Sequence, residues 1–115
     1  MSFFIKSFRL KPQASNKNEA LPNNTTFTVS TDIVCRKHFP HDKYIFKYFA
    51  GEKLIAESLK DCSFADENHS INDSITVASH NWGKGKKIKI HVSVLVIQES
   101  SGASLNNETT TWVRS

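Results

Sequence analysis

Residues 87–98 read Lys-Ile-Lys-Ile-His-Val-Ser-Val-Leu-Val-Ile-Gln and show the clearest alternation of apolar and polar side chains in the chain. One parity is apolar throughout and comprises Ile88, Ile90, Val92, Val94 and Val96. The other parity is polar at Lys89 and His91 and apolar at Leu95 and Ile97. A period of two is that of a β-strand, whose successive side chains point to opposite faces. The stretch therefore predicts a strand that begins at the rim of a two-layer structure and runs into its centre.

The same period recurs along most of the chain. It predicts strands over residues 3–11, 25–35, 71–79 and 109–114, and a β-hairpin over 43–59 in which Gly51 supplies the positive φ of the turn. The intervening segments are rich in turn-forming residues and are predicted as loops: 12–24, 38–42, 81–86 and 99–107. No window of about 11 residues keeps the spacing of an amphipathic helix.

Length and composition set the fold class. The chain has 115 residues, of which 38% are hydrophobic and 23% charged, and this favours one folded domain over 1–115. Nine Asn, fourteen Ser and eight Thr favour turns and strands over helices. With about seven strands separated by turns, the sequence predicts an all-β fold. We expect a single antiparallel β-sandwich, with a small closed β-barrel as the alternative.

The order of these strands resembles that of immunoglobulin-like or fibronectin-like sandwiches, with an early strand that ends in Cys35, an aromatic strand over 43–49 and a long late strand over 87–98. Immunoglobulin domains place a Trp between two paired cysteines, whereas here no Trp lies between Cys35 and Cys62. The resemblance is therefore one of architecture. It implies no particular activity, because such folds have many unrelated functions.

The two cysteines are too few for a disulfide scaffold. We expect Cys35 and Cys62 to be free, buried thiols, the common state of cysteine in a folded interior. A disulfide between them is the alternative if their strands lie side by side.

Lysines and one tryptophan gather around residues 81–89. The candidate ligand-binding residues are Asn81, Trp82, Lys84, Lys86, Lys87 and Lys89. Ammonium groups and glycine-rich backbone could hold an anionic ligand, and an exposed Trp82 could stack on a base or a sugar. Lysines of this kind also flank aggregation-prone strands and keep them soluble. Only three arginines occur in the chain, which argues against sequence reading of DNA, so nucleic acid is not the expected partner.

Carbohydrate binding is a further candidate for the same loop. Aromatic rings stack on sugar faces, and an amide such as that of Asn81 binds hydroxyl groups. Trp82 is the ring expected to bind, whereas Trp112 is expected in the core.

Neither a metal site nor a catalytic site is predicted. Cys35, His38 and His41 follow one another at three-residue intervals, but a fourth ligand is missing and the neighbouring basic residues would repel a cation. The acidic stretch 61–73 lacks the ligand spacing of an EF-hand, and we expect a solvated loop there rather than a calcium site. The sequence contains no recognised nucleophile motif, so we expect a protein that is not an enzyme and holds no cofactor.

These patterns predict a non-catalytic binding or assembly module that acts through protein–protein contact, with another protein or with itself through an edge strand. A carbohydrate-binding module is the alternative, and a lysine-rich polyanion binder is third. Residues 1–6 hold too short an apolar run for a secretory signal, and no stretch of about 18 apolar residues predicts a membrane span. The default compartment is the cytoplasm, and export without a cleaved signal stays open.

Overall fold

Eight strands account for most of the computed structural model, which describes residues 3–35, 42–62, 69–82 and 85–114. In chain order they are β1 (Phe3–Lys11), β2 (Leu21–Pro22), β3 (Thr26–Cys35), β4 (Asp42–Ala50), β5 (Lys53–Cys62), β6 (His69–Ala78), β7 (Ile88–Gln98) and β8 (Ser104–Arg114). The only helical segments among the described residues are two short 3-10 turns, η1 (Lys17–Glu19) and η2 (Ser79–Asn81).

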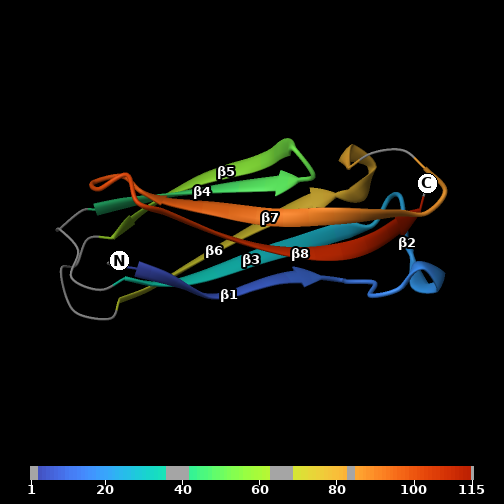
Figure 1. The fold of residues 1–115 in the computed structure, drawn as a ribbon, viewed down its shortest axis with the longest axis horizontal. Coiled ribbons are helices and arrows are strands. Elements are labelled where there is room, and N and C mark those ends of the chain that lie inside the picture. The colour runs from blue at the N-terminus through green and yellow to red at the C-terminus, as the bar shows by residue number, and fades with distance from the viewer. Residues whose placement is uncertain (1–2, 36–41, 63–68, 83–84, 115) are drawn as a thin grey trace.

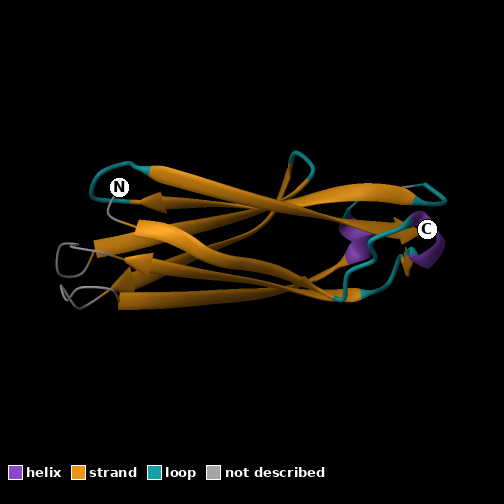
Figure 2. Ribbon diagram, turned by 60° about the horizontal axis from the view of Figure 1, so that its bottom comes forward, coloured by secondary structure: helices purple, strands orange, loops and turns teal. Residues whose placement is uncertain are grey.

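The strands form two sheets that pack face to face along one long axis (Figures 1 and 2). One sheet has the order β1-β3-β6 and is antiparallel, and the other has the order β2-β8-β7-β4-β5 and is antiparallel except where β2 runs parallel to β8. The predicted all-β sandwich is therefore confirmed. The closed-barrel alternative is wrong for the described strands, because they hydrogen-bond as two separate sheets. A specifically immunoglobulin-like topology stays a prediction.

Alternate residues of the long strands fill the space between the sheets. The parities predicted for the two clearest strands are confirmed, since Phe27 and Val29 of β3 and Val92 and Val94 of β7 have no exposed surface. β4 contributes the largest core side chains, Tyr44, Phe46 and Tyr48. Burial of this many apolar groups supplies the main free energy that favours folding.

The β4–β5 hairpin forms as predicted. Gly51 has a φ of 62°, a left-handed conformation that side chains with a Cβ adopt at a cost. Its backbone N–H also donates a 2.7 Å hydrogen bond to the carbonyl oxygen of His91, which fixes the hairpin tip against β7. β5 pairs with β4 along its whole length, with one register shift between Tyr48 and Phe49.

β8 is longer than predicted. The sequence indicated a loop over 99–107 and a strand only from 109, but β8 begins at Ser104. Its first residues are Ser, Leu, Asn, Asn and Glu, which are poor strand formers, yet each pairs with β7 in an unbroken ladder. Tertiary pairing overrides local propensity at these positions.

The predicted loop 12–24 crosses from one sheet to the other. It includes η1 and the two-residue strand β2, neither of which was predicted. The backbone N–H of Ala14 donates to Oγ1 of Thr111 (2.9 Å), and the N–H of Trp112 donates to the carbonyl oxygen of Ala14 (3.1 Å). These bonds attach the crossing segment to β8. Of the turn predicted over 38–42, residues 38–41 lie outside the described residues, and Asp42 begins β4.

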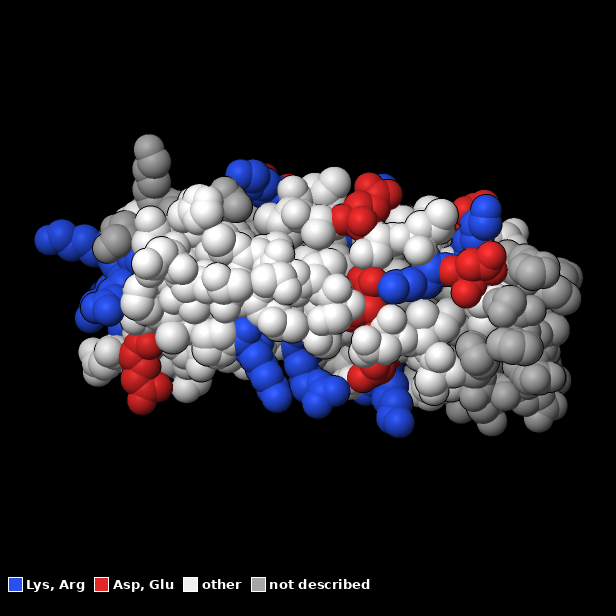
Figure 3. All heavy atoms as spheres, turned by 180° about the vertical axis from the view of Figure 1, so that it is seen from behind, with Lys and Arg blue, Asp and Glu red and all other residues white. Residues whose placement is uncertain are grey.

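The outward surface of the three-stranded sheet is polar and mostly uncharged. Thr28 pairs with Thr76, and the Ser30 and Ser74 hydroxyls share a hydrogen bond of 3.1 Å. Figure 3 views this side of the molecule: uncharged side chains cover most of it, a few acidic and basic side chains lie near its centre, and Lys and Arg side chains lie along one long border. Such a surface is the one that the alternation in β3 predicted to face water.

Candidate functional site

The predicted ligand-binding residues do not share one environment. Trp82 is buried, with 6% of its surface exposed, whereas Lys86, Lys87 and Lys89 are exposed. Asn81 ends η2, and only its backbone is described. Lys84 lies outside the described residues.

The expectation that Trp82 is exposed is wrong. Its ring stacks on Phe27 with centroids 4.5 Å apart and an interplanar angle of 28°, so it belongs to the core. The chain reaches this position through η2, where the N–H of Ser79 donates to the carbonyl oxygen of Thr25 and the N–H of Trp82 donates to that of Ser79. A tryptophan on a glycine-rich loop therefore closes one end of the sandwich, and the ring proposed to stack on a base or sugar is not available at the surface.

The two tryptophans exchange their expected roles. Trp112, expected in the core, is only partly buried and lies between the buried Thr111 and Val113, on the outward side of β8. Lys89 of β7 stands directly opposite it in the antiparallel register. Strand alternation would have indicated the outward position of Trp112. Val113 points into the core, and successive residues of a strand point to opposite faces.

The exposed lysines mark a stretch of β7 that lacks one neighbour. β4 ends at Ala50, opposite Val92, and the Gly51 N–H reaches the His91 carbonyl oxygen, so within the described residues only 88–90 of β7 pair with β8 alone. Unpaired strand edges promote association between chains, and lysine is the residue most often found there. This placement agrees with the alternative that the lysines protect the strand. Together with Arg114, these lysines give one end of the molecule a basic surface, next to the partly exposed Trp112.

The opposite half of the same sheet surface carries large apolar side chains among charged ones. We call the outward surface of β5, β4 and β7 the outer face, and its residues are Lys43, Ile45, Lys47, Phe49, Leu54, Glu57, Leu59, Asp61, Ser93, Leu95 and Ile97. Leu54 is 46% exposed and Leu59 is 58% exposed. Ile45 lies between Leu59 and Ile97 in one row across the three strands.

The outer face corrects the interpretation of residues 87–98. A strand that is apolar on both sides was expected to enter the centre of the structure, with both sides covered. Here Val94 and Val96 are fully buried between the sheets, but Leu95 and Ile97 lie on the outer face, partly exposed. The apolar character of this second side has no partner within the described chain.

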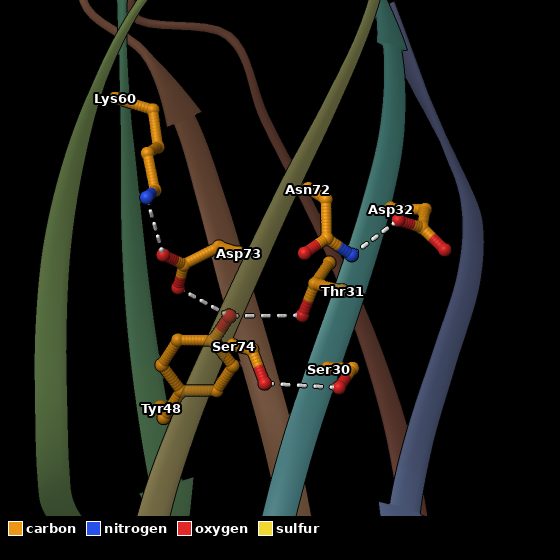
Figure 4. Close-up of polar contacts among 8 residues, drawn as sticks. All are labelled: Ser30, Thr31, Asp32, Tyr48, Lys60, Asn72, Asp73 and Ser74. Carbon is orange, nitrogen blue, oxygen red and sulfur yellow. Dashed lines mark hydrogen bonds and ion pairs between the residues drawn. The ribbon is translucent and has the colours of Figure 1, made fainter.

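A buried polar network joins the two sheets (Figure 4). The Tyr48 hydroxyl on β4 donates to Oδ2 of Asp73 on β6 (2.7 Å) and accepts from Oγ1 of Thr31 on β3 (3.1 Å). Lys60 of β5 reaches the same carboxylate, with Nζ 3.5 Å from Oδ1. Burial, and then the bond to Asp73, raise the pKa of Tyr48, so this phenol stays protonated and acts as a donor.

A second buried polar group lies near the other end of the same strand. The Gln98 amide donates to Oδ2 of Asp42 (2.9 Å) and to the Tyr44 hydroxyl (3.2 Å), and Ser100 donates to the same carboxylate oxygen (3.0 Å). Tyr44 also has a raised pKa, mainly because it is buried. Both networks satisfy polar atoms that would otherwise be costly to bury.

Cys35 and Cys62 are buried thiols that form no disulfide, as predicted. Burial raises the pKa of the Cys35 thiol to about 11, which keeps it protonated and unreactive. Within the described ranges, no three His, Cys, Asp or Glu side chains gather closely enough to hold a metal ion. His38 and His41, and residues 63–68 of the candidate calcium stretch, lie outside those ranges.

Neither the family models nor the curated protein sequences contain a match to this chain. No helix among the described residues is long and apolar enough to cross a membrane.

Proposed function

We propose that the protein is a non-catalytic contact module that binds another protein chain through the outer face. The observation that supports this is the row of large apolar side chains on β5, β4 and β7, with Leu54 and Leu59 about half exposed. Single exposed apolar residues are ordinary on protein surfaces, but contiguous ones mark interaction sites. The partner supported by this surface is a protein, because exposed apolar rows that alternate with rows of charged pairs offer both apolar area and charged groups for contact with another chain.

The two surfaces of the sandwich differ, and this supports the choice of face. The outward side of the three-stranded sheet carries mainly Ser, Thr and Asn, which water solvates well, with Phe4 and Val34 as an apolar pair at one end. The outer face carries Phe49, Leu95 and Ile97 at equivalent positions of the other sheet. A chain that functioned alone would gain nothing from an apolar second side on β7, whereas a partner would bury it.

Site-specific photocrosslinking tests this proposal. A benzophenone side chain at position 59 should capture a protein, identified by mass spectrometry, whereas the same group at position 28 should not. Thr28 is the matched control because it is exposed on a strand of the opposite sheet. Equal labelling at the two positions, or none at either, would show that the outer face has no special role in protein contact.

The basic end supports a second candidate, polyanion binding. Lys86, Lys87, Lys89 and Arg114 are exposed there, and the partly exposed Trp112 lies opposite Lys89. Binding to a heparin column should then weaken steeply between low and moderate salt, because released counterions dominate such affinities. A double substitution of Lys87 and Lys89 to Gln should advance elution, whereas Lys6→Gln and Lys11→Gln on β1 should not. Equal effects of the two pairs would indicate binding through net charge alone.

A further inference from the structure

The β4–β5 hairpin places complementary residues opposite one another in four consecutive outward rows. The antiparallel register pairs Lys43 with Asp61, Ile45 with Leu59, Lys47 with Glu57, and Phe49 with Leu54. In the two charged rows, the lysine is always on β4 and the carboxylate always on β5. In the two apolar rows, both positions are apolar.

This arrangement is complementary to itself. Consider a second copy rotated by 180° about an axis that lies just above the outer face, runs along the strands and passes between β4 and β5. The rotation keeps each row at its place along the strands and lays β5 of one copy over β4 of the other. Glu57 then meets Lys47 of the second copy, Leu59 meets Ile45, and the reciprocal contacts form at the same time.

The geometry of sheet packing permits this contact. Two sheets pack face to face with strand directions within about 30° and a separation of about 10 Å. A rotation axis along the strands gives such an aligned packing. The two apolar rows would form the buried part of the contact and would enclose the Lys47–Glu57 row that lies between them, while Leu95 and Ile97 of β7 would border it. The charged rows would set the register, because a shift by one row would place Lys47 over Leu59 and Glu57 over Ile45 of the other copy.

We propose that the occupant of the outer face is a second copy of this chain, held as a two-fold symmetric dimer by the four rows of the β4–β5 hairpin. This inference rests on the proposed function, since it names the partner of the same surface. The contact is only two strands wide in each copy, so the dimer is weak, with a Kd of roughly 100 μM.

The experiment uses reversed charges in the row formed by Lys47 and Glu57. In a Glu57→Lys chain, two-fold symmetry brings two ammonium groups together twice, and in a Lys47→Glu chain it brings two carboxylates together twice. Sedimentation equilibrium up to about 1 mM protein should show the wild type dimerising and each variant alone weakened by about tenfold or more. A 1:1 mixture of the two variants should regain the affinity of the wild type, since both mixed contacts then join a lysine to a glutamate.

Two controls make the result specific. Thr76→Lys, on the outward side of β6, adds a positive charge to the opposite surface and should dimerise like the wild type. Circular dichroism checks that both charge variants are folded, because each also places like charges side by side within one chain. Recovery in the mixture does not depend on that intrachain effect.

The inference is overturned if the wild type is monomeric at about 1 mM, if the single variants dimerise as well as the wild type, or if the mixture does not recover. Failure here is distinct from failure of the proposed function. A wild-type monomer whose position 59 still crosslinks to a different protein would refute the dimer and leave the contact module standing.

Discussion

The Tyr48 hydroxyl donates a 2.7 Å hydrogen bond to the Asp73 carboxylate, and this bond crosses from one sheet to the other. Asp73 is only 3% exposed, so its charge depends on the groups around it. Tyr48 and Lys60 are two of those groups, from different strands of the facing sheet. The interior of the sandwich thus fixes the relative position of its two layers by polar contacts as well as by apolar packing.

Replacing Tyr48 by Phe should destabilise the protein by about 2 kcal/mol, because it removes a donor from a buried carboxylate while keeping the ring. Urea denaturation gives the free energy of unfolding. Ser30→Ala is the control, since the Ser30–Ser74 bond lies on the exposed surface and should contribute less than about 0.5 kcal/mol. Equal losses for the two variants would contradict a structural role for the buried bond.

Replacing Lys60 by Met should cost about 1 to 2 kcal/mol, because the Asp73 carboxylate loses its cation in a buried place. The cost stays below that of a fully buried pair because the lysine side chain is 43% exposed. Arg9→Met removes the cation from Asp32, where both partners are more accessible, and should cost less than about 0.5 kcal/mol. Urea denaturation measures the free energy of unfolding of both variants, and a loss for Lys60→Met no larger than that for Arg9→Met would contradict this prediction.

Asp32 should titrate below the ordinary range for aspartate. The Asn72 amide, at 2.5 Å, and then the Ser7 hydroxyl, at 2.8 Å, hold the pKa of Asp32 down. Because the folded pKa is below the unfolded value of about 3.9, Asp32 stabilises the protein above that value, and the contribution is lost as pH falls through the folded pKa.

Carboxyl ¹³C NMR titration measures this pKa directly. Asn72→Ala should raise the pKa of Asp32, whereas Ser74→Ala, two residues along the same strand, should leave it in place. A wild-type pKa at or above the ordinary value would show that the amide bond is not formed in solution.

Cys35 should resist alkylation in the folded protein, since it has no exposed surface and its pKa is raised to about 11. The raised pKa also means that this thiol stabilises the fold below the unfolded value of about 8.5, and that this contribution is lost as pH rises from there toward 11. Mass spectrometry after iodoacetamide treatment at about pH 8, just below the ordinary thiol pKa, should show labelling only when urea is added. Thr28→Cys, an exposed position on the same strand, should react in the native protein and so calibrate the rate.

The period of two in the sequence was sufficient to predict the long strands and the inward parity of β3 and β7. That signal is strong because one face of each strand must be dry. The hairpin at Gly51 was predictable for a related reason, since few other residues adopt its φ of 62° without strain.

The roles of the tryptophans were not predictable from local composition. Trp82 sits among glycines and lysines, a context typical of an exposed loop, but η2 turns the chain so that the ring covers Phe27. Only the tertiary path of the chain decides this. The start of β8 was missed for a comparable reason, because polar residues 104–108 form a strand when β7 offers its edge.

The sequence indicated part of the candidate contact surface. The apolar second side of β7 was visible as Leu95 and Ile97, but the sequence did not show whether another layer of the same chain would cover them. The cross-strand rows of β4 and β5 depend on their register, which contains a shift between Tyr48 and Phe49. An irregularity of this kind cannot be deduced from alternation alone.

The hairpin closed by Gly51 has a consequence for how this surface can diversify. Alternate residues of β4 hold the sandwich together from within, while the residues between them, with their β5 neighbours, form the outward rows. Residues 43–61 therefore encode the scaffold and the proposed contact surface in alternating positions of one short segment. Exchanging only the outward positions would transfer a new binding preference to the same framework, with no change to the distant strands.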